Sequence, residues 1–156
     1  MQAHNHKHRG FSLIELVVVV VIVGILAAIA IPRLSRGSAG AADSALAGNL
    51  AVLRKAIDLY SSEHGGSFPT ATNFASAMTQ YTDSSGTLSA TPSSTCIYGP
   101  YLRSIPPLPV GAAKGNNGVA AATGSGVGWI YTASTGTIQA NTTTEADISG
   151  KLYSAY

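Results

Sequence analysis

An unbroken apolar run near the N-terminus constrains this chain more than any other feature. Residues 16–31 are all apolar or Gly, and counted from Phe11, with two polar positions tolerated, the run reaches about 20 residues, enough for a helix to span a bilayer. The β-branched residues at 17–23 would favour a strand in water, but a lone strand in lipid leaves its backbone groups unpaired. The sequence therefore predicts a membrane-spanning helix over residues 11–32, which Pro32 ends.

Glu15 is the feature of this run that length alone does not explain. An ionised carboxylate in hydrocarbon costs about 2.5–3.5 kcal/mol even on insertion scales, so we expect this acid to have a function. A secretory signal peptide would account for the basic residues Lys7 and Arg9 and for a cleavage site at Ala28-Ile29-Ala30. It would not account for Glu15, nor for Pro32 two residues past that site. A plain single-pass anchor would explain the length but not the acid.

The stretch Arg9-Gly10-Phe11-Ser12-Leu13-Ile14-Glu15-Leu16-Val17-Val18 resembles the class III signal of type IV pilins and pseudopilins. The resemblance accounts for the length of the run, the acid and the Gly10-Phe11 junction together. It implies that a prepilin peptidase cleaves between Gly10 and Phe11 and N-methylates Phe11. It further implies that Glu15 pairs with the terminal amine of a neighbouring subunit, which makes Phe11 and Glu15 the residues of filament assembly.

The orientation of the span does not follow from its flanking charges. Lys7 and Arg9 precede it and Arg33 and Arg36 follow it, so the positive-inside comparison is a tie. The resemblance implies a single pass through the bacterial inner membrane, with the leader in the cytoplasm and the head in the periplasm. The partners it implies are other copies of the chain, the prepilin peptidase/methylase, minor pilins or pseudopilins, an assembly ATPase and a membrane platform protein. A net charge of +2 with scattered basic residues argues against nucleic acid as a partner.

A second helix segment is predicted after the span. Gly37 and Gly40 follow Pro32 and cost a helix about 2 kcal/mol together relative to Ala, so these three residues predict a break or hinge. Residues 43–64 then show a helical apolar stripe that we expect to pack on the chain's own head, and Gly65-Gly66 ends the helix. The stripe consists of Leu46, Leu50, Leu53, Ile57 and Tyr60.

The rest of the chain predicts a small head with a C-terminal β-hairpin. Residues 127–131 and 137–141 are strand-like and are joined by a short turn, with a third strand expected near residues 96–102 or 148–153. Residues 70–95 read as a linker with a short helix near 74–81, and the glycine-rich residues 111–126 read as an irregular loop. The segments Gly99-Pro100-Tyr101-Leu102 and Gly128-Trp129-Ile130-Tyr131 resemble parts of pseudopilin G-like proteins.

The predicted fold is therefore α+β and pilin-like, with a long N-terminal helix packed on a small antiparallel β-sheet. We expect four parts: a cleaved leader at 1–10, a transmembrane and filament-core helix at 11–32, a hinge and amphipathic helix at 33–64, and a globular head at 65–156.

No pattern of catalytic or cofactor-binding residues is visible, and we predict a structural subunit rather than an enzyme. His4, His6 and His8 add charge to the leader, and His64 is expected to cap its helix or face water. Cys96 is the only cysteine in the sequence, so it forms no intrachain disulfide and is expected to be a buried thiol. We predict no cofactor.

Pseudopilin G-like proteins, which parts of this chain resemble, carry a calcium site in a C-terminal loop, so the resemblance raises the question of calcium here. Residues 142–156 hold only Glu145 and Asp147 as acids, which is few for a cation that binds several oxygens. We therefore do not predict a calcium site, and the tail is expected to be held by packing. The side chains expected to pack are Ile148, Leu152, Tyr153 and Tyr156.

Three functions remain open at this point. The first is the major pseudopilin of a type II protein secretion system. The two pseudopilin-like segments favour it, and so does the single cysteine, since many type IV pilins close a C-terminal loop with a pair of cysteines. The second is the major subunit of an extracellular type IV pilus used for adhesion or motility. The third is a monomeric membrane-anchored binding domain.

Overall fold

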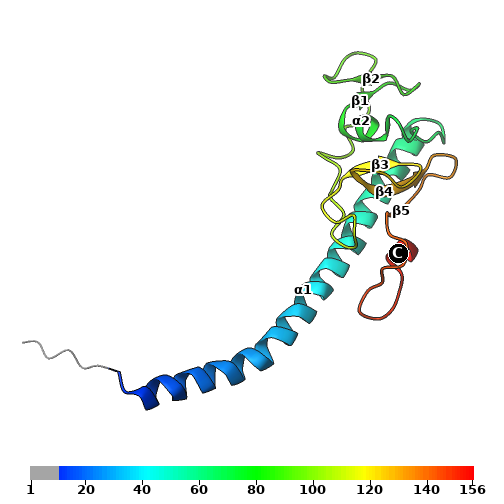
Figure 1. The fold of residues 1–156 in the computed structure, drawn as a ribbon. Helices are drawn as coiled ribbons and strands as arrows, with labels where there is room; N and C mark the ends of the chain where they lie inside the picture. The colour runs from blue at the N-terminus through cyan, green and yellow to red at the C-terminus, as the bar shows by residue number, and fades with distance from the viewer. Residues whose placement is uncertain (1–10) are drawn as a thin grey trace, which may run out of the picture. The chain divides into compact units, whose positions relative to one another are not determined.

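The computed structural model describes residues 11–156, and within the first helix it describes the backbone but not the side chains of Pro32, Ser35 and Arg36. The predicted leader, with His4, His6, His8 and Gly10, lies outside the described residues. The described residues divide into two compact units, one that ends at Ser38 and one over Ala39–Tyr156, which are treated separately below. The fold is α+β, as predicted (Figure 1).

Helix α1 runs without interruption over Leu13–Glu63, a length of 51 residues. The predicted helix end at Pro32 is therefore wrong, and Gly37 and Gly40 are also helical residues. A proline inside a helix costs about 3 kcal/mol, and the segments on both sides of Pro32 favour the helix strongly enough to outweigh this cost. Downstream of the two glycines the chain is rich in alanine, the strongest helix former. A hinge in this zone remains a prediction, and the boundary between the two units falls within it, after Ser38.

The second half of α1 packs the predicted stripe into the core of the head. Leu46, Leu50, Leu53, Ile57 and Tyr60 are each at most 4% exposed. The helix ends as predicted, because Gly65 and Gly66 take positive φ angles of 63° and 85°, a region that glycine enters at little cost. Gly66 donates its N–H to the carbonyl of Ser61 at 2.8 Å, which satisfies one of the last helical acceptors.

A second face of this helix carries apolar side chains that no other part of residues 11–156 covers. Val52 is 52% exposed and Leu59 is 48% exposed, and they are seven residues apart, so they lie on one side of the helix. Ala45 lies one further heptad toward the N-terminus and is also exposed. The second half of α1 therefore has two apolar faces, one buried in the head and one open.

The head contains five short strands in two sheets. Helix α2 (Phe74–Thr79) confirms the predicted short helix, and β4 (Val127–Thr132) pairs antiparallel with β5 (Thr137–Ala140), which confirms the predicted hairpin. Strands β1 (Tyr81–Thr82) and β2 (Leu88–Ser89) form a separate antiparallel pair within the predicted linker. A short 3₁₀ turn, η1 (Tyr153–Ala155), lies near the C-terminal end.

The third strand of the main sheet is not where the sequence predicts it. It is β3 (Gly118–Ala120), which pairs parallel with β4 and lies in the segment predicted to be an irregular loop. Glycines allow this pairing, since a Cβ on Gly118 would lie 2.5 Å from the carbonyl oxygen of Gly126. A Cβ on Gly128 would lie 2.1 Å from that of Asn116. Gly118, one of the glycines that suggested a loop, is thus a residue that lets the backbones approach, and so is Gly128 within the predicted strand.

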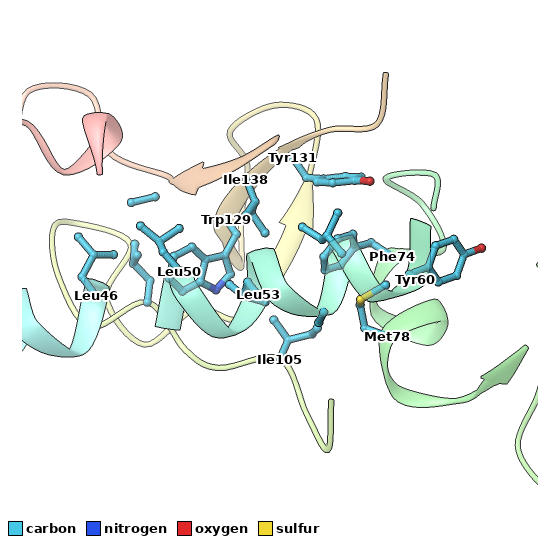
Figure 2. Packing of buried hydrophobic residues seen from close by; sticks show 14 of the residues in the cluster. Leu46, Leu50, Leu53, Tyr60, Phe74, Met78, Ile105, Trp129, Tyr131 and Ile138 are labelled. Atoms are coloured by element: carbon cyan, nitrogen blue, oxygen red, sulfur yellow. The ribbon is translucent and has the colours of Figure 1, made fainter. Parts of the chain in front are cut away.

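The core of the head joins the sheet to α1. Trp129 and Ile138 point from the strands toward Leu50 and Leu53 on the helix (Figure 2). Trp129 is fully buried, and its indole Nε1 donates to the carbonyl of Pro106 at 2.8 Å. Tyr131 is also fully buried and donates its hydroxyl to the carbonyl of Pro69 at 3.1 Å. Each buried ring therefore has its polar group satisfied.

Two loops of the head share one architecture that the sequence analysis did not anticipate. Each has the sequence Asp-x-Ser-Gly-x, and its aspartate Oδ1 accepts three hydrogen bonds, from the serine N–H, the serine hydroxyl and the N–H of the last residue. Each glycine has a positive φ, and each loop is bracketed by an antiparallel pair, Thr82↔Leu88 in one and Ala146↔Leu152 in the other. The two loops are residues 83–87 and 147–151.

The C-terminal tail is held differently from the prediction. Tyr153 and Tyr156 pack against the core as expected, but Ile148 is 73% exposed and Leu152 is 43% exposed. Ile148 lies in the tight turn of residues 147–151, at the surface. Polar contacts supply the rest: the Tyr153 hydroxyl donates to Asp43 at 2.9 Å, and Arg54 Nη2 donates to the main-chain oxygen of Tyr156 at 2.6 Å.

Candidate functional site

The first turn of α1 carries the acid that the sequence analysis singled out. The helix begins at Leu13, so Ser12 is the N-cap residue and Glu15 is the third helical residue. Glu15 Oε2 accepts a hydrogen bond from the main-chain N–H of Ser12 at 2.8 Å. This is the reciprocal half of a capping box, in which a glutamate satisfies a free donor at the helix start. The partial positive charge of the helix N-terminus also favours an acid at this position.

Apolar side chains surround this acid. Glu15 forms a shallow surface hollow of about 330 Å³ with Phe11, Ile14, Val18 and Val19. Phe11 itself is 82% exposed. The environment is therefore hydrocarbon-like around a single carboxylate.

The helix that follows has the length and composition of a membrane span. Residues Leu13–Ile31 have a mean hydropathy of 3.2, and none of them is buried within the structure. Between residues 11 and 38, Glu15 is the only acidic residue. Apolar side chains that find no cover within the chain need lipid or another protein around them.

The chemistry available to Glu15 is pairing with a donor or a cation. Its Oε2 is bonded to Ser12, while Oε1 has no hydrogen-bond partner among residues 11–156. The acid therefore offers one free oxygen, beside Phe11, at the exposed end of an apolar helix. The hydrogen bond from the N–H of Ser12 to Glu15 was missed in the sequence analysis, although the Ser-x-x-Glu pattern at residues 12–15 is a recognised signal for a helix start.

Glu145 and Asp147, the candidate calcium ligands, are engaged within the chain. Glu145 Oε1 accepts from the N–H of Ala112 at 2.9 Å, and its Oε2 accepts from the N–H of Thr143 at 3.0 Å. Asp147 Oδ1 accepts the three donors of its turn, and the Tyr156 hydroxyl donates to Asp147 Oδ2. Within the described part of the chain, no group of three or more His, Cys, Asp or Glu residues is placed to hold a metal ion.

These hydrogen bonds make the stability of the head depend on pH. The hydroxyl of Ser85 and the N–H of Thr87 lower the pKa of Asp83 to about 2. The Tyr156 hydroxyl, with smaller effects of Ser149, holds the pKa of Asp147 well below its usual range, and the N–H of Ala112 lowers the pKa of Glu145. A carboxyl whose pKa is lower in the folded than in the unfolded chain stabilises the fold at pH values above its unfolded-state pKa. That stability is lost as the pH falls through the folded value.

We therefore expect the free energy of unfolding to fall as the pH is lowered from about 5 to about 2. Urea denaturation of the wild-type chain across this range measures the slope. In a double variant, Asp83→Asn with Asp147→Asn, the amide oxygens still accept hydrogen bonds but do not titrate, so the slope should become shallower while Glu145 keeps part of it. An unchanged slope in the double variant would contradict the assignment.

His64 and Cys96 can be compared directly with the predictions. His64 caps the helix, because its Nδ1 lies 2.8 Å from the carbonyl oxygen of Tyr60. The alternative that it faces water is wrong, since it is only 6% exposed and its ring stacks on Tyr60 with centroids 3.8 Å apart. Cys96 is a free and buried thiol, 6% exposed, as predicted.

Comparison with known proteins gives one match. Residues 5–31 match the family described as the prokaryotic N-terminal methylation motif. The matched segment contains the Gly10-Phe11 junction, Glu15 and most of the apolar run. Neither a curated protein nor a solved structure matches the chain. The match supports a pilin-like subunit that a prepilin peptidase processes, and it is confined to the N-terminal segment.

Proposed function

We propose that this chain is a structural subunit of a type IV pilus-like filament, and specifically the major pseudopilin of a type II protein secretion system. One observation carries the proposal: the matched methylation motif coincides with the uncovered apolar segment Leu13–Ile31 of α1, whose single acid, Glu15, lies in the first turn of the helix. Cleavage after Gly10 would give Phe11 a positive amine. The free oxygen of Glu15 on another copy would then have a partner of opposite charge.

The driving force for assembly would come from the free-energy cost of the Glu15 carboxylate in lipid. The capping bond from Ser12 satisfies one oxygen of Glu15 within its own chain, and the other oxygen remains to be paired. Docking against a charged amine replaces a lipid environment with an ion pair, which gives each added subunit a driving force and a fixed register. Methylation of the amine leaves its charge in place, so the pair can still form.

The apolar surface of α1 fits a position at the centre of a polymer. The side chains of Leu13–Ile31 are uncovered, and Val52 and Leu59 are open on a face of the helix that does not contact the head's core. Helices packed side by side would cover these side chains, with the heads placed outside. Subunit extraction needs energy, and the proposal assigns it to a cytoplasmic ATPase acting through a membrane platform protein.

Two features of the head support the pseudopilin over a surface pilus. The sequence has one cysteine, so the C-terminal loop is held by hydrogen bonds of Arg54 and Asp147 rather than by a disulfide. The pseudopilin-like segments also lie at structurally important places. Trp129 and Tyr131 are core residues, and the N–H groups of Tyr101 and Leu102 bind the carbonyl of Met78 at 2.9 and 2.8 Å.

The experiment that tests the proposal is to shear cells and to identify the mature chain by mass spectrometry in both the sheared and the membrane fractions. We expect the chain to begin at N-methylated Phe11 and to remain with the membrane, as a filament confined to the periplasm would. If the same mature chain dominates the sheared filaments, it is a surface pilus subunit. A chain that begins at Met1 or after Ala30 would contradict the filament assignment altogether.

A further inference from the structure

Residues 84–95 form a part of the head that is unusually rich in hydroxyl groups. Eight of these twelve residues are Ser or Thr, and the segment also contains Pro92. It begins in the turn between β1 and β2 and continues beyond β2 (Figure 1). Residues 90–95 form no helix or strand, and each of them is exposed. A stretch of Ser and Thr with proline is the composition typical of O-glycosylated segments.

Hydrogen bonds divide the hydroxyl groups of residues 90–95 into engaged and free ones. Ser93 Oγ accepts the N–H of Cys96 at 3.0 Å and lies 3.3 Å from Thr95 Oγ1. The hydroxyls of Thr91 and Ser94 have no hydrogen-bond partner among residues 11–156. These two hydroxyls are therefore the ones that a modifying enzyme could reach without breaking a contact.

The backbone around Thr91 favours it over Ser94 as the modified residue. The hydroxyl of Ser89 donates to the carbonyl of Thr91 at 2.7 Å, which holds the main chain while leaving the Thr91 side chain free. Pro92 follows directly, and a residue before proline is restricted to extended backbone, the form in which a chain enters an enzyme's cleft most easily. The neighbours Ala90 and Ser93 are small, so they leave room for a bulky group on Thr91.

The charge of the segment distinguishes a sugar from a phosphate. Asp83 is the only Asp, Glu, Lys or Arg between residues 65 and 102 of the sequence. A phosphate on Thr91 would therefore have no arginine or lysine within this stretch to pair with, and it would add negative charge to a stretch that already contains an acid. A neutral sugar avoids this cost, and its own hydroxyl groups stay hydrated at an exposed position.

The head also contains the sequence pattern of N-glycosylation, Asn141-Thr142-Thr143, and the structure argues against its use. Asn141 Nδ2, the atom that would carry the sugar, donates to the carbonyl of Val127 at 2.7 Å. The Asn141 side chain is only partly exposed, and Thr142 Oγ1 is buried. Modification at this position would break the contact between the end of β5 and the start of β4.

We propose that Thr91 is a site of O-glycosylation, with a neutral sugar joined to its Oγ1. The donor is a sugar activated as a diphosphate ester, and a glycosyltransferase supplies the catalysis. The Thr91 oxygen attacks the anomeric carbon of the sugar, and the bond from that carbon to the diphosphate breaks. The diphosphate leaves with the bonding electron pair, and the hydroxyl proton passes to a base of the transferase. The proposal concerns the head alone and holds for a pseudopilus and for a surface pilus.

The test is a tryptic mass map of the mature chain purified from the cells that make it. Trypsin cleaves after Lys55 and Arg103, which gives one peptide, 56–103, that contains Thr91. Cleavage after Lys114 and Lys151 gives another, 115–151, that contains Asn141. We expect the first peptide to be heavier by whole sugar residues, to release sugar oxonium ions on fragmentation, and to carry the added mass on Thr91. An unmodified first peptide, a phosphate on it, or a sugar on the second peptide alone would overturn the proposal.

Three variants connect the added mass to one hydroxyl. Thr91→Val keeps the shape of the side chain but removes the acceptor oxygen, so the sugar should be lost completely. Thr91→Ser keeps an acceptor and should still be modified. Thr144→Val, at an exposed threonine outside the segment, is the matched control and should carry the sugar as the wild type does. Wild-type occupancy in Thr91→Val would show that Thr91 is not the acceptor. The N-terminal peptide of the same digests reports leader cleavage separately, so failure here does not depend on the outcome for the filament.

Discussion

Replacing Glu15 with alanine should leave the chain processed and inserted in the membrane but unable to form filaments. The acid has one oxygen on the N–H of Ser12 and one free, within a surface of apolar side chains. If that free oxygen pairs with the amine of a neighbouring copy, its loss removes about 3 kcal/mol from each subunit addition, roughly a hundredfold in the equilibrium constant. Filament yield, measured by electron microscopy and by the amount of chain in the sheared or pelleted polymer, reports this directly.

Glu15→Gln is the variant that separates charge from helix capping. A glutamine at this position can still accept the hydrogen bond from Ser12, so the start of α1 should stay intact. It carries no charge, and we expect it to fail in assembly as the alanine variant does. Wild-type filament yield from Glu15→Gln would mean that the capping bond, and not an ion pair, is what assembly requires. Leader cleavage, followed by intact mass, serves as the control that both variants reach the membrane.

Replacing Trp129 with alanine should destabilise the head by about 3–5 kcal/mol, the usual cost of deleting a large buried aromatic side chain. Trp129 is fully buried against α1, and its indole N–H is bound to the carbonyl of Pro106, which would lose its donor. The free energy of unfolding of a small domain is only about 5–15 kcal/mol, so this single change should remove a large part of it. Trp129 is the only tryptophan, so urea unfolding should be followed by near-ultraviolet circular dichroism of the tyrosines instead of by fluorescence.

Two comparisons make this measurement specific. Trp129→Phe keeps an aromatic ring but removes the N–H, and we expect a smaller loss of about 1–3 kcal/mol from the unpaired carbonyl and the lost volume. Ile97→Ala removes an apolar side chain that is 64% exposed and should change the free energy of unfolding by less than about 0.5 kcal/mol. A similar loss in Ile97→Ala and Trp129→Ala would show that burial in this core is not what stabilises the head.

The helical parts of the molecule could be predicted because their signals are local. The spacing from Leu46 to Tyr60 repeats with the period of a helix, and every residue of that stripe is buried as expected. The hairpin of β4 and β5 was predictable for the same reason, since a short turn joins two strand-like runs. Pro32 misled the prediction, because a proline signals a helix end only when the following segment does not favour the helix as strongly.

The rest of the head could not be predicted because it depends on contacts between distant segments. β3 is three residues long in a glycine-rich stretch, and its pairing with β4 depends on backbone clearance at Gly118 and Gly128. The unpaired Nε2 of His64 likewise depends on which side chains surround the ring, which periodicity does not reveal. For the proposed assembly site, the cost of an acid in lipid singled out Glu15 from the sequence, but the hydrogen bond from the N–H of Ser12 to this acid was not predicted.

The two apolar faces of α1 place different demands on one stretch of sequence. Toward the head, Leu50 and Leu53 must fit a fixed volume, so a change there is felt by a single isolated molecule. On the second apolar face, Val52 and Leu59 are half-exposed within residues 11–156, so in the proposed filament only neighbouring copies would constrain their shape. The neighbouring residues Val52 and Leu53 can therefore be under selection for different properties. Leu53 would be selected for the folding of one subunit, and Val52 for the packing of subunits in the proposed filament.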